Sequence, residues 1–122
     1  MPVFHVYLNG KKVSTAGVGD LGVLSTHVTW VRRTQEDMHV KMPLEELTLH
    51  VGGLISSKRE HVRWLDRPLQ VGDEVRITIA EAAKVDRPRT RKRSDPAEDL
   101  RRQKRYVRQM AKRFGWKIQT RP

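Results

Sequence analysis

The sequence contains no cysteine, which excludes disulfide bonds and thiolate metal ligands. It also lacks the ~20 consecutive apolar residues of a membrane-spanning helix, and its first residues do not resemble a signal peptide. There is no G-x-S-x-G motif, and acid pairs such as Glu45-Glu46 are adjacent, so their side chains would diverge on a strand. We therefore expect a soluble, non-enzymatic protein of the cytoplasm with no membrane contact, and we assign no catalytic residue.

Excess positive charge is absent from the first two thirds of the chain. Residues 1–83 contain ten Lys or Arg and ten Asp or Glu, whereas residues 84–122 contain fifteen and four. The whole net charge of +11 therefore lies in the last third, where apolar residues are also sparse. We predict a neutral β-domain (1–83), a basic linker (84–94) and a basic amphipathic helix with a C-terminal tail (95–122). Such asymmetry indicates an anionic partner for the basic part.

The neutral part has the composition and alternation of β-strands. Strand-like segments occur at 3–8, 23–33, 47–55, 60–65 and 73–82. Asn9-Gly10 is typical of a tight hairpin turn. No helical segment of 10–15 residues separates the strands, which argues against a parallel α/β sheet. We predict a mainly β fold, either an antiparallel β-sandwich or a partly open barrel, followed by one C-terminal helix.

Residues 17–22 spell G-x-G-x-x-G, the pattern of a dinucleotide-binding loop. That loop needs a helix directly after it, whose N-terminal amides hold the pyrophosphate. Here the strand-like segment 23–33 follows instead. We interpret the glycines as a connection between two strands in which glycine permits positive φ, and we predict no cofactor.

Residues 95–115 carry the signals of a complete helix. Asp95 suits the N-cap, Pro96 the first helical position, and Glu98 stands three residues after the cap. Gly115 is expected to end the helix, with Trp116 packing back onto the last turn. An apolar stripe is formed by Leu100, Val107, Met110, Ala111 and Phe114.

The basic arm gives the strongest functional signal. Arginine contacts phosphates in a bidentate manner and stacks on bases, and aromatic side chains add stacking surfaces. The candidate binding residues are Arg87, Arg89, Arg91, Lys92, Arg93, Arg101, Arg102, Lys104, Arg105, Tyr106, Arg108, Lys112, Arg113 and Trp116. Two partners stay open: nucleic acid, or the acidic surface of a protein to which the chain is an adaptor, inhibitor or assembly subunit. A merely solvated basic helix is the third interpretation.

Every histidine is followed by valine. Because neighbours on a strand point to opposite faces, this pattern places in the core Val6, Val28, Val51, Val62, Trp30 and Trp64. The opposite face is predicted to carry His5, Tyr7, His27, His50, His61 and Arg63. We interpret it as a solvated polar sheet face, with a ligand-binding or catalytic face as the alternative. The spacing of the histidines does not indicate a metal site.

Overall fold

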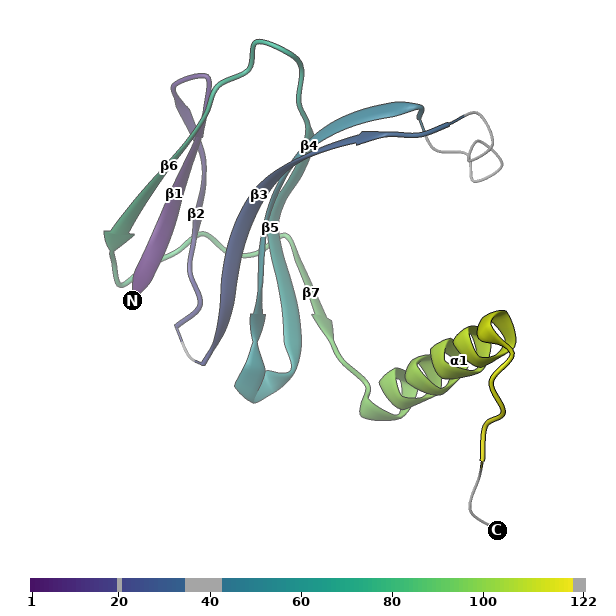
Figure 1. Cartoon of the computed structure of the whole chain (residues 1–122). Coiled ribbons are helices and arrows are strands. Elements are labelled where there is room, and N and C mark those ends of the chain that lie inside the picture. Colours follow the sequence, from purple (N-terminus) through teal and green to yellow (C-terminus); the bar gives the residue numbers. More distant parts are fainter. Residues whose placement is uncertain (20, 35–42, 120–122) are drawn as a thin grey trace.

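The computed structural model describes residues 1–19, 21–34 and 43–119. These residues form seven strands in two antiparallel sheets (Figure 1). One sheet has the order β2 (Lys11–Ala16), β1 (Pro2–Leu8), β6 (Val75–Glu81). The other has the order β3 (Gly22–Arg32), β4 (Glu45–Ile55), β5 (Glu60–Pro68), β7 (Thr90–Arg93). A short 3-10 helix, η2 (Ser56–Lys58), joins β4 to β5, and α1 (Pro96–Phe114) follows β7.

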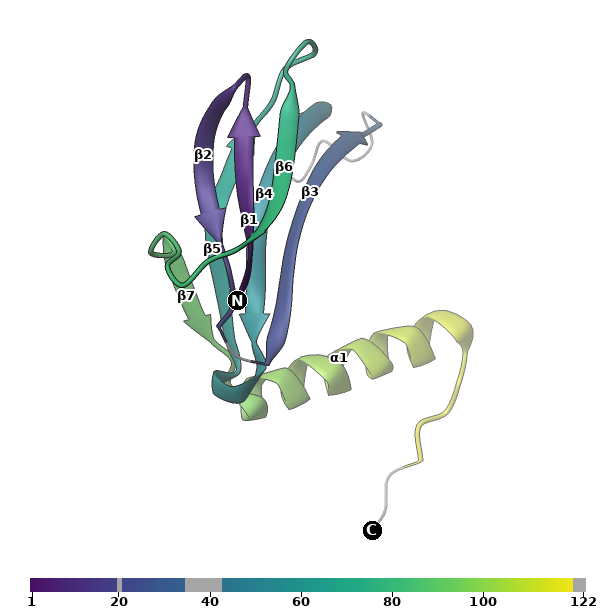
Figure 2. The ribbon, with the colours of Figure 1, turned by 90° about the vertical axis from the view of Figure 1, so that its left-hand side faces the viewer.

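The two sheets face each other as a sandwich (Figures 1 and 2). Strand β2 of the first sheet lies against β4 and β5 of the second. The sheets are not closed into a barrel, and β3 and β6 stand at the ends of their strand orders. This confirms the predicted mainly β class with a C-terminal helix, and the sandwich is the form that it takes.

The core lies between the sheets. It is built from both of them by Val6, Ala16, Leu49, Val51, Val62, Trp64 and Leu65. Leu49, Val6 and Val51 are completely buried, and burying an aliphatic side chain of this size contributes about 1.5–3 kcal/mol. The core therefore confirms the predicted inward face for the valines of β1, β4 and β5.

Two residues predicted in the core are not there. Val28 and Trp30 of β3 are 54% and 58% exposed. Val28 is paired with the buried Leu49, so the alternation of faces is as predicted. However, β3 is an edge strand, and its second half curves with β4 away from the other sheet (Figure 1). The prediction was wrong because none of the described strands of the other sheet covers this part of the face.

The glycine-rich segment connects β2 of one sheet to β3 of the other, as interpreted from the sequence. The proposed reason for the glycines was wrong, since neither Gly17 nor Gly22 is among the residues with positive φ. Close packing explains both. A Cβ atom at Gly17 would lie 2.8 Å from a methyl group of Val85, and one at Gly22 would lie 1.9 Å from the carbonyl oxygen of Leu54. Asp20 of the motif lies outside the described residues.

The predicted linker contains an element that the sequence did not reveal. Residues 90–93 form β7, which pairs with β5 from Arg63↔Thr90 to Glu60↔Arg93. Upstream, the backbone N–H and the carboxylate of Asp86 bind the backbone of Thr15 at 2.9 and 2.8 Å. The indole N–H of Trp64 donates to the Asp86 carbonyl oxygen at 2.8 Å. Much of segment 84–94 is therefore fixed to the body, while the domain boundary near residue 83 stays a prediction.

Candidate nucleic-acid interface

Helix α1 has the capping interactions that its sequence predicts. The Asp95 carboxylate accepts from the Ala97 backbone N–H at 2.9 Å. Gly115 adopts a left-handed φ of 70° and its N–H bonds to the Ala111 carbonyl. The Trp116 ring then stacks on Phe114, with 5.1 Å between ring centroids. The two capping hydrogen bonds satisfy backbone groups that a helix leaves open at its ends. The helix projects away from the sheets (Figures 1 and 2).

One side of α1 is uniformly cationic. At 3.6 residues per turn, five side chains fall within an arc of about 100° on the helix surface. This basic face consists of Arg101, Lys104, Arg105, Arg108 and Lys112. All five are exposed. The face extends over eleven residues of rise, or about 16 Å, which is long enough to contact several successive phosphates.

The ion pairs of α1 lie elsewhere. Arg102 contacts the carboxylates of Glu98 and Asp99 at 3.5 and 3.4 Å within the first turns. No residue of the basic face forms an ion pair with an acid in the described part of the chain. The basic face therefore presents charge that is not neutralised by those residues, whereas Arg102 is already engaged.

The arginines of β7 and its approach do not form one surface. Lys92 pairs with His61, so both side chains lie on the same face of the sheet. Because successive side chains on a strand point to opposite faces, Arg91 and Arg93 lie on the other face. Arg91 is paired with Glu60 at 2.8 Å. Arg87 and Arg89 are exposed in the segment between β6 and β7. The sequence predicts one basic surface from these residues and the helix because β7 has no recognisable strand pattern.

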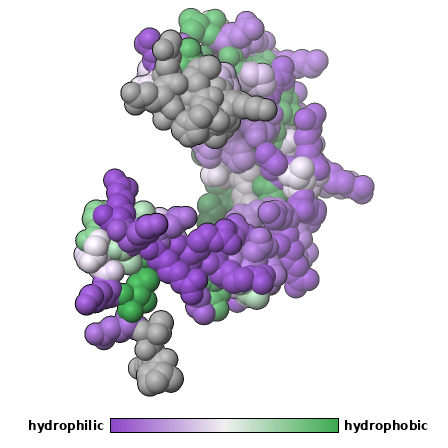
Figure 3. All heavy atoms as spheres, turned by 90° about the vertical axis from the view of Figure 1, so that its right-hand side faces the viewer, coloured by the Kyte–Doolittle hydropathy of each residue, from purple (hydrophilic) through white to green (hydrophobic). Residues whose placement is uncertain are grey.

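The two aromatic candidates lie away from the basic face. Tyr106 and Trp116 line an apolar groove of about 570 Å³, formed by α1 and the segment after it. Val107, Met110 and Phe114 of the predicted apolar stripe line the same groove. Figure 3 shows hydrophobic side chains gathered at this end of the helix, beyond a largely hydrophilic stretch. Two cations outside the basic face accompany these rings: Arg113 lies over the Phe114 ring at 5.5 Å from its centroid, and Lys117 lines the groove.

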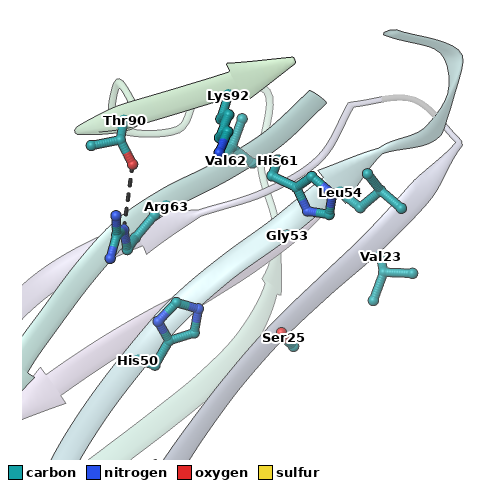
Figure 4. Close-up of a pocket in the computed structure, with 10 residues that line it drawn as sticks. All are labelled: Val23, Ser25, His50, Gly53, Leu54, His61, Val62, Arg63, Thr90 and Lys92. Carbon is teal, nitrogen blue, oxygen red and sulfur yellow. Dashed lines mark hydrogen bonds between the residues drawn. The ribbon is translucent and has the colours of Figure 1, made fainter. Parts of the chain in front are cut away.

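Four of the six residues of the predicted polar sheet face come together. His27, His50, His61 and Arg63 lie on the side of the four-stranded sheet that faces away from the core, which we call the outer face. Lys92 joins them through β7 (Figure 4). His5 and Tyr7 belong to the other sheet, where His5 contacts the Thr15 hydroxyl at 3.0 Å and Arg76 lies over the Tyr7 ring. The expected single face is therefore two separate surfaces.

The outer face has a defined local geometry. The rings of His27 and His50 stack with 4.9 Å between centroids and 25° between planes. Burial lowers the pKa of His50, and neighbouring His27 and Arg63 lower it further, against the opposing effect of Asp66. Arg63 donates to Asp66 at 2.9 Å and to the Thr90 hydroxyl at 3.4 Å. The depressed pKa favours a neutral His50 ring near pH 7.

No group of three or more His, Asp or Glu side chains in residues 1–19, 21–34 and 43–119 is arranged to hold a metal ion. Over the same residues, no helix has the length and apolarity to cross a membrane.

No family model, curated protein or solved structure matches the chain.

Proposed function

We propose that the protein is a non-enzymatic module that binds nucleic acid through the basic face of α1. The observation that carries the proposal is the set of five exposed cations on one side of a capped helix, without acid partners among the described residues. Arginine and lysine in this arrangement neutralise phosphates and release their counterions. Contacts to phosphate give affinity without reading base sequence. As part of this proposal, the protein acts in the cytoplasm, as expected from the sequence.

The test compares two triple charge reversals of equal size. One changes Arg101, Arg105 and Arg108 to Glu on the basic face, and its control changes Lys11, Lys12 and Lys58 to Glu on the exposed surface of the body. Binding of labelled DNA and RNA is measured by fluorescence anisotropy at near-physiological salt with heparin as competitor. We expect the helix variant to lose binding and the control to retain most of it, because the control lowers net charge without touching the proposed interface.

Salt dependence provides an independent measurement. The logarithm of the binding constant should fall linearly with the logarithm of salt concentration, with a slope of about −0.9 per phosphate on duplex DNA and about −0.7 on single strands. The helix variant should have a shallower slope than the control. Equal losses in both variants, or affinity no better than that for heparin on every substrate, would reject the proposal.

A protein partner is the second candidate, and the apolar stripe of α1 favours it. Leu100, Val107 and Phe114 are each at least half exposed, and an amphipathic helix with a bare apolar side commonly docks in a groove of a partner. The basic face would then meet acids around that groove. Replacing Val107 and Phe114 with Ser should abolish a stoichiometric, nuclease-resistant complex under this alternative, and should leave nucleic-acid affinity nearly unchanged under the first proposal.

A further inference from the structure

The outer face contains an open pocket whose lining includes no residue of the basic face of α1. Its volume is about 520 Å³, within the range of about 300–1,000 Å³ that is typical of ligand sites. Strands β3, β4, β5 and β7 all contribute to it (Figure 4). Figure 3 looks at this side of the molecule and shows a hollow above α1 with hydrophobic side chains on its floor.

The lining combines apolar surface with imidazole rings. Val23 and Leu54 project from β3 and β4 onto the outer face, and Val23 is 57% exposed. Gly52 lets the His50 ring lie close to the strand, because a Cβ atom there would stand 2.7 Å from the His50 Nε2 atom. The pocket therefore combines the apolar surface of Val23 and Leu54 with two imidazole rings, whose nitrogens can take part in hydrogen bonds.

The rim of the pocket is cationic and polar. Lys92 forms no ion pair with any residue that the structure describes, and Figure 4 shows it beside His61. Arg63 is oriented by Asp66 and Thr90. Ser25 and Thr90 add hydroxyl groups. A flat apolar part and an anionic group in one ligand match this lining, and a nucleotide has both.

We propose that this pocket receives one unpaired nucleotide of a single-stranded nucleic acid, with the base between His50 and His61 and the phosphate at Lys92. The proposal rests on the proposed function and deepens it by naming the class of nucleic acid. Histidine rings are among the side chains on which unpaired bases stack. The bases of a duplex are covered by their neighbours and cannot enter, whereas a single strand can turn its bases toward the sheet.

The pocket and α1 are close enough to act on one strand. The first turn of the helix lies against the same region, where His61, Lys92, Glu98 and Asp99 line a small cavity of about 100 Å³. Three acids line this cavity. Glu98 and Asp99 are paired with Arg102, and the Asp95 carboxylate accepts from the Ala97 backbone N–H. A strand with one base in the pocket can therefore continue toward the basic face past acids that each already have a partner.

The histidine ring signals in an NMR spectrum of the full chain provide the direct test. On titration with a single-stranded oligonucleotide, we expect the ring signals of His50 and His61 to shift and those of His5, on the other sheet, to stay. A duplex of the same sequence should bind without moving any of the three. A nucleoside monophosphate should shift the same two signals, only at much higher concentration.

Affinity measurements complete the test. The double variant His50→Ala, His61→Ala should bind single strands about ten-fold more weakly, which corresponds to the loss of one stacked base. Its duplex affinity should not change. The control His5→Ala should behave as the unaltered protein, and melting curves establish that each variant is folded.

Three outcomes would overturn the inference. Binding of single strands without a shift of His50 and His61 would place the bases elsewhere. Equal losses on single strands and duplex would mean that the variant acts through charge or folding. Saturation by the monophosphate at the concentration that saturates the oligonucleotide would assign the pocket to a free nucleotide. All three differ from failure of the proposed function, which is decided by the charge reversals on α1.

Discussion

Two segments of the chain share the pattern His-Val-x-Trp and have different environments. Residues 61–64 lie in β5, where Trp64 is 5% exposed. Residues 27–30 lie in β3, where Trp30 is 58% exposed. Strand β5 has a partner on both sides and lies opposite β2, whereas β3, among the strands that the structure describes, is paired with β4 alone. Alternation thus decides which face a side chain takes, and the position of the strand in the sheet decides whether that face is covered.

The indole N–H groups of Trp64 and Trp30 also have different kinds of hydrogen-bond partner. The Trp64 N–H donates to the backbone carbonyl of Asp86, which belongs to the segment that leads to β7. The Trp30 N–H donates to the exposed carboxylate of Glu45 on the neighbouring strand. A buried donor needs its partner because water cannot replace it, so only Trp64 depends on a distant part of the chain.

Replacing each tryptophan with alanine should give the largest difference in the free energy of unfolding between the two segments. We expect Trp64→Ala to lower the free energy of unfolding by about 3–5 kcal/mol, the cost of removing a large buried aromatic side chain. For Trp30→Ala, on the exposed half of an edge strand, we expect a change within about 0.5 kcal/mol. Urea denaturation followed by circular dichroism measures both. Similar losses would show that β3 is covered in solution, for example by a second molecule.

Truncation of the chain can remove the hydrogen-bond partner of Trp64 while leaving that of Trp30 in place. A chain of residues 1–83 lacks Asp86, so the Trp64 donor is left unpaired at a cost of about 1–3 kcal/mol. A chain of residues 1–94 retains this bond and β7, and is the matched control. We expect the longer chain to be the more stable one in the same denaturation experiment. Equal stability would support the boundary at residue 83 that charge and composition predict.

Sequence reasoning worked where the signal is local. The caps of α1 depend on Asp95 and Gly115, whose effects reach only a few residues, and the turn at Asn9-Gly10 has positive φ at both positions. The strands β1, β3, β4, β5 and β6 were recognised from alternation or from β-branched composition. These features carry their physical cause in neighbouring residues, so one sequence is enough to find them.

The remainder depends on pairing between distant segments. Strand β7 consists of four residues, Thr-Arg-Lys-Arg, without an apolar side chain, so it shows no alternation of apolar and polar residues that would predict a strand. Its pairing with β5 nevertheless brings Lys92 to the outer face. The meeting of His27 with His50 likewise requires the register of β3 against β4. The histidines were found from the sequence, but the pocket that some of them line was not, because it depends on sheet order.

The histidines of the two segments should differ in a smaller effect, the pH dependence of stability. The pKa of His50 is lowered in the folded protein, and its neighbour His27 contributes to this while His61 does not. The unfolded chain therefore binds a proton at His50 more readily than the folded one, so stability is complete above about pH 6.5 and falls as the pH drops through the folded pKa. Unfolding free energies at pH 7.5 and pH 5 measure the fall. We expect His50→Gln to reduce this loss of unfolding free energy between pH 7.5 and pH 5. His27→Gln should reduce the loss partly, and His61→Gln should leave it as in the unaltered protein. If His27→Gln and His61→Gln had the same effect, the stacked pair of β3 and β4 would not be the origin of the pH dependence, and the two segments would be equivalent in this respect.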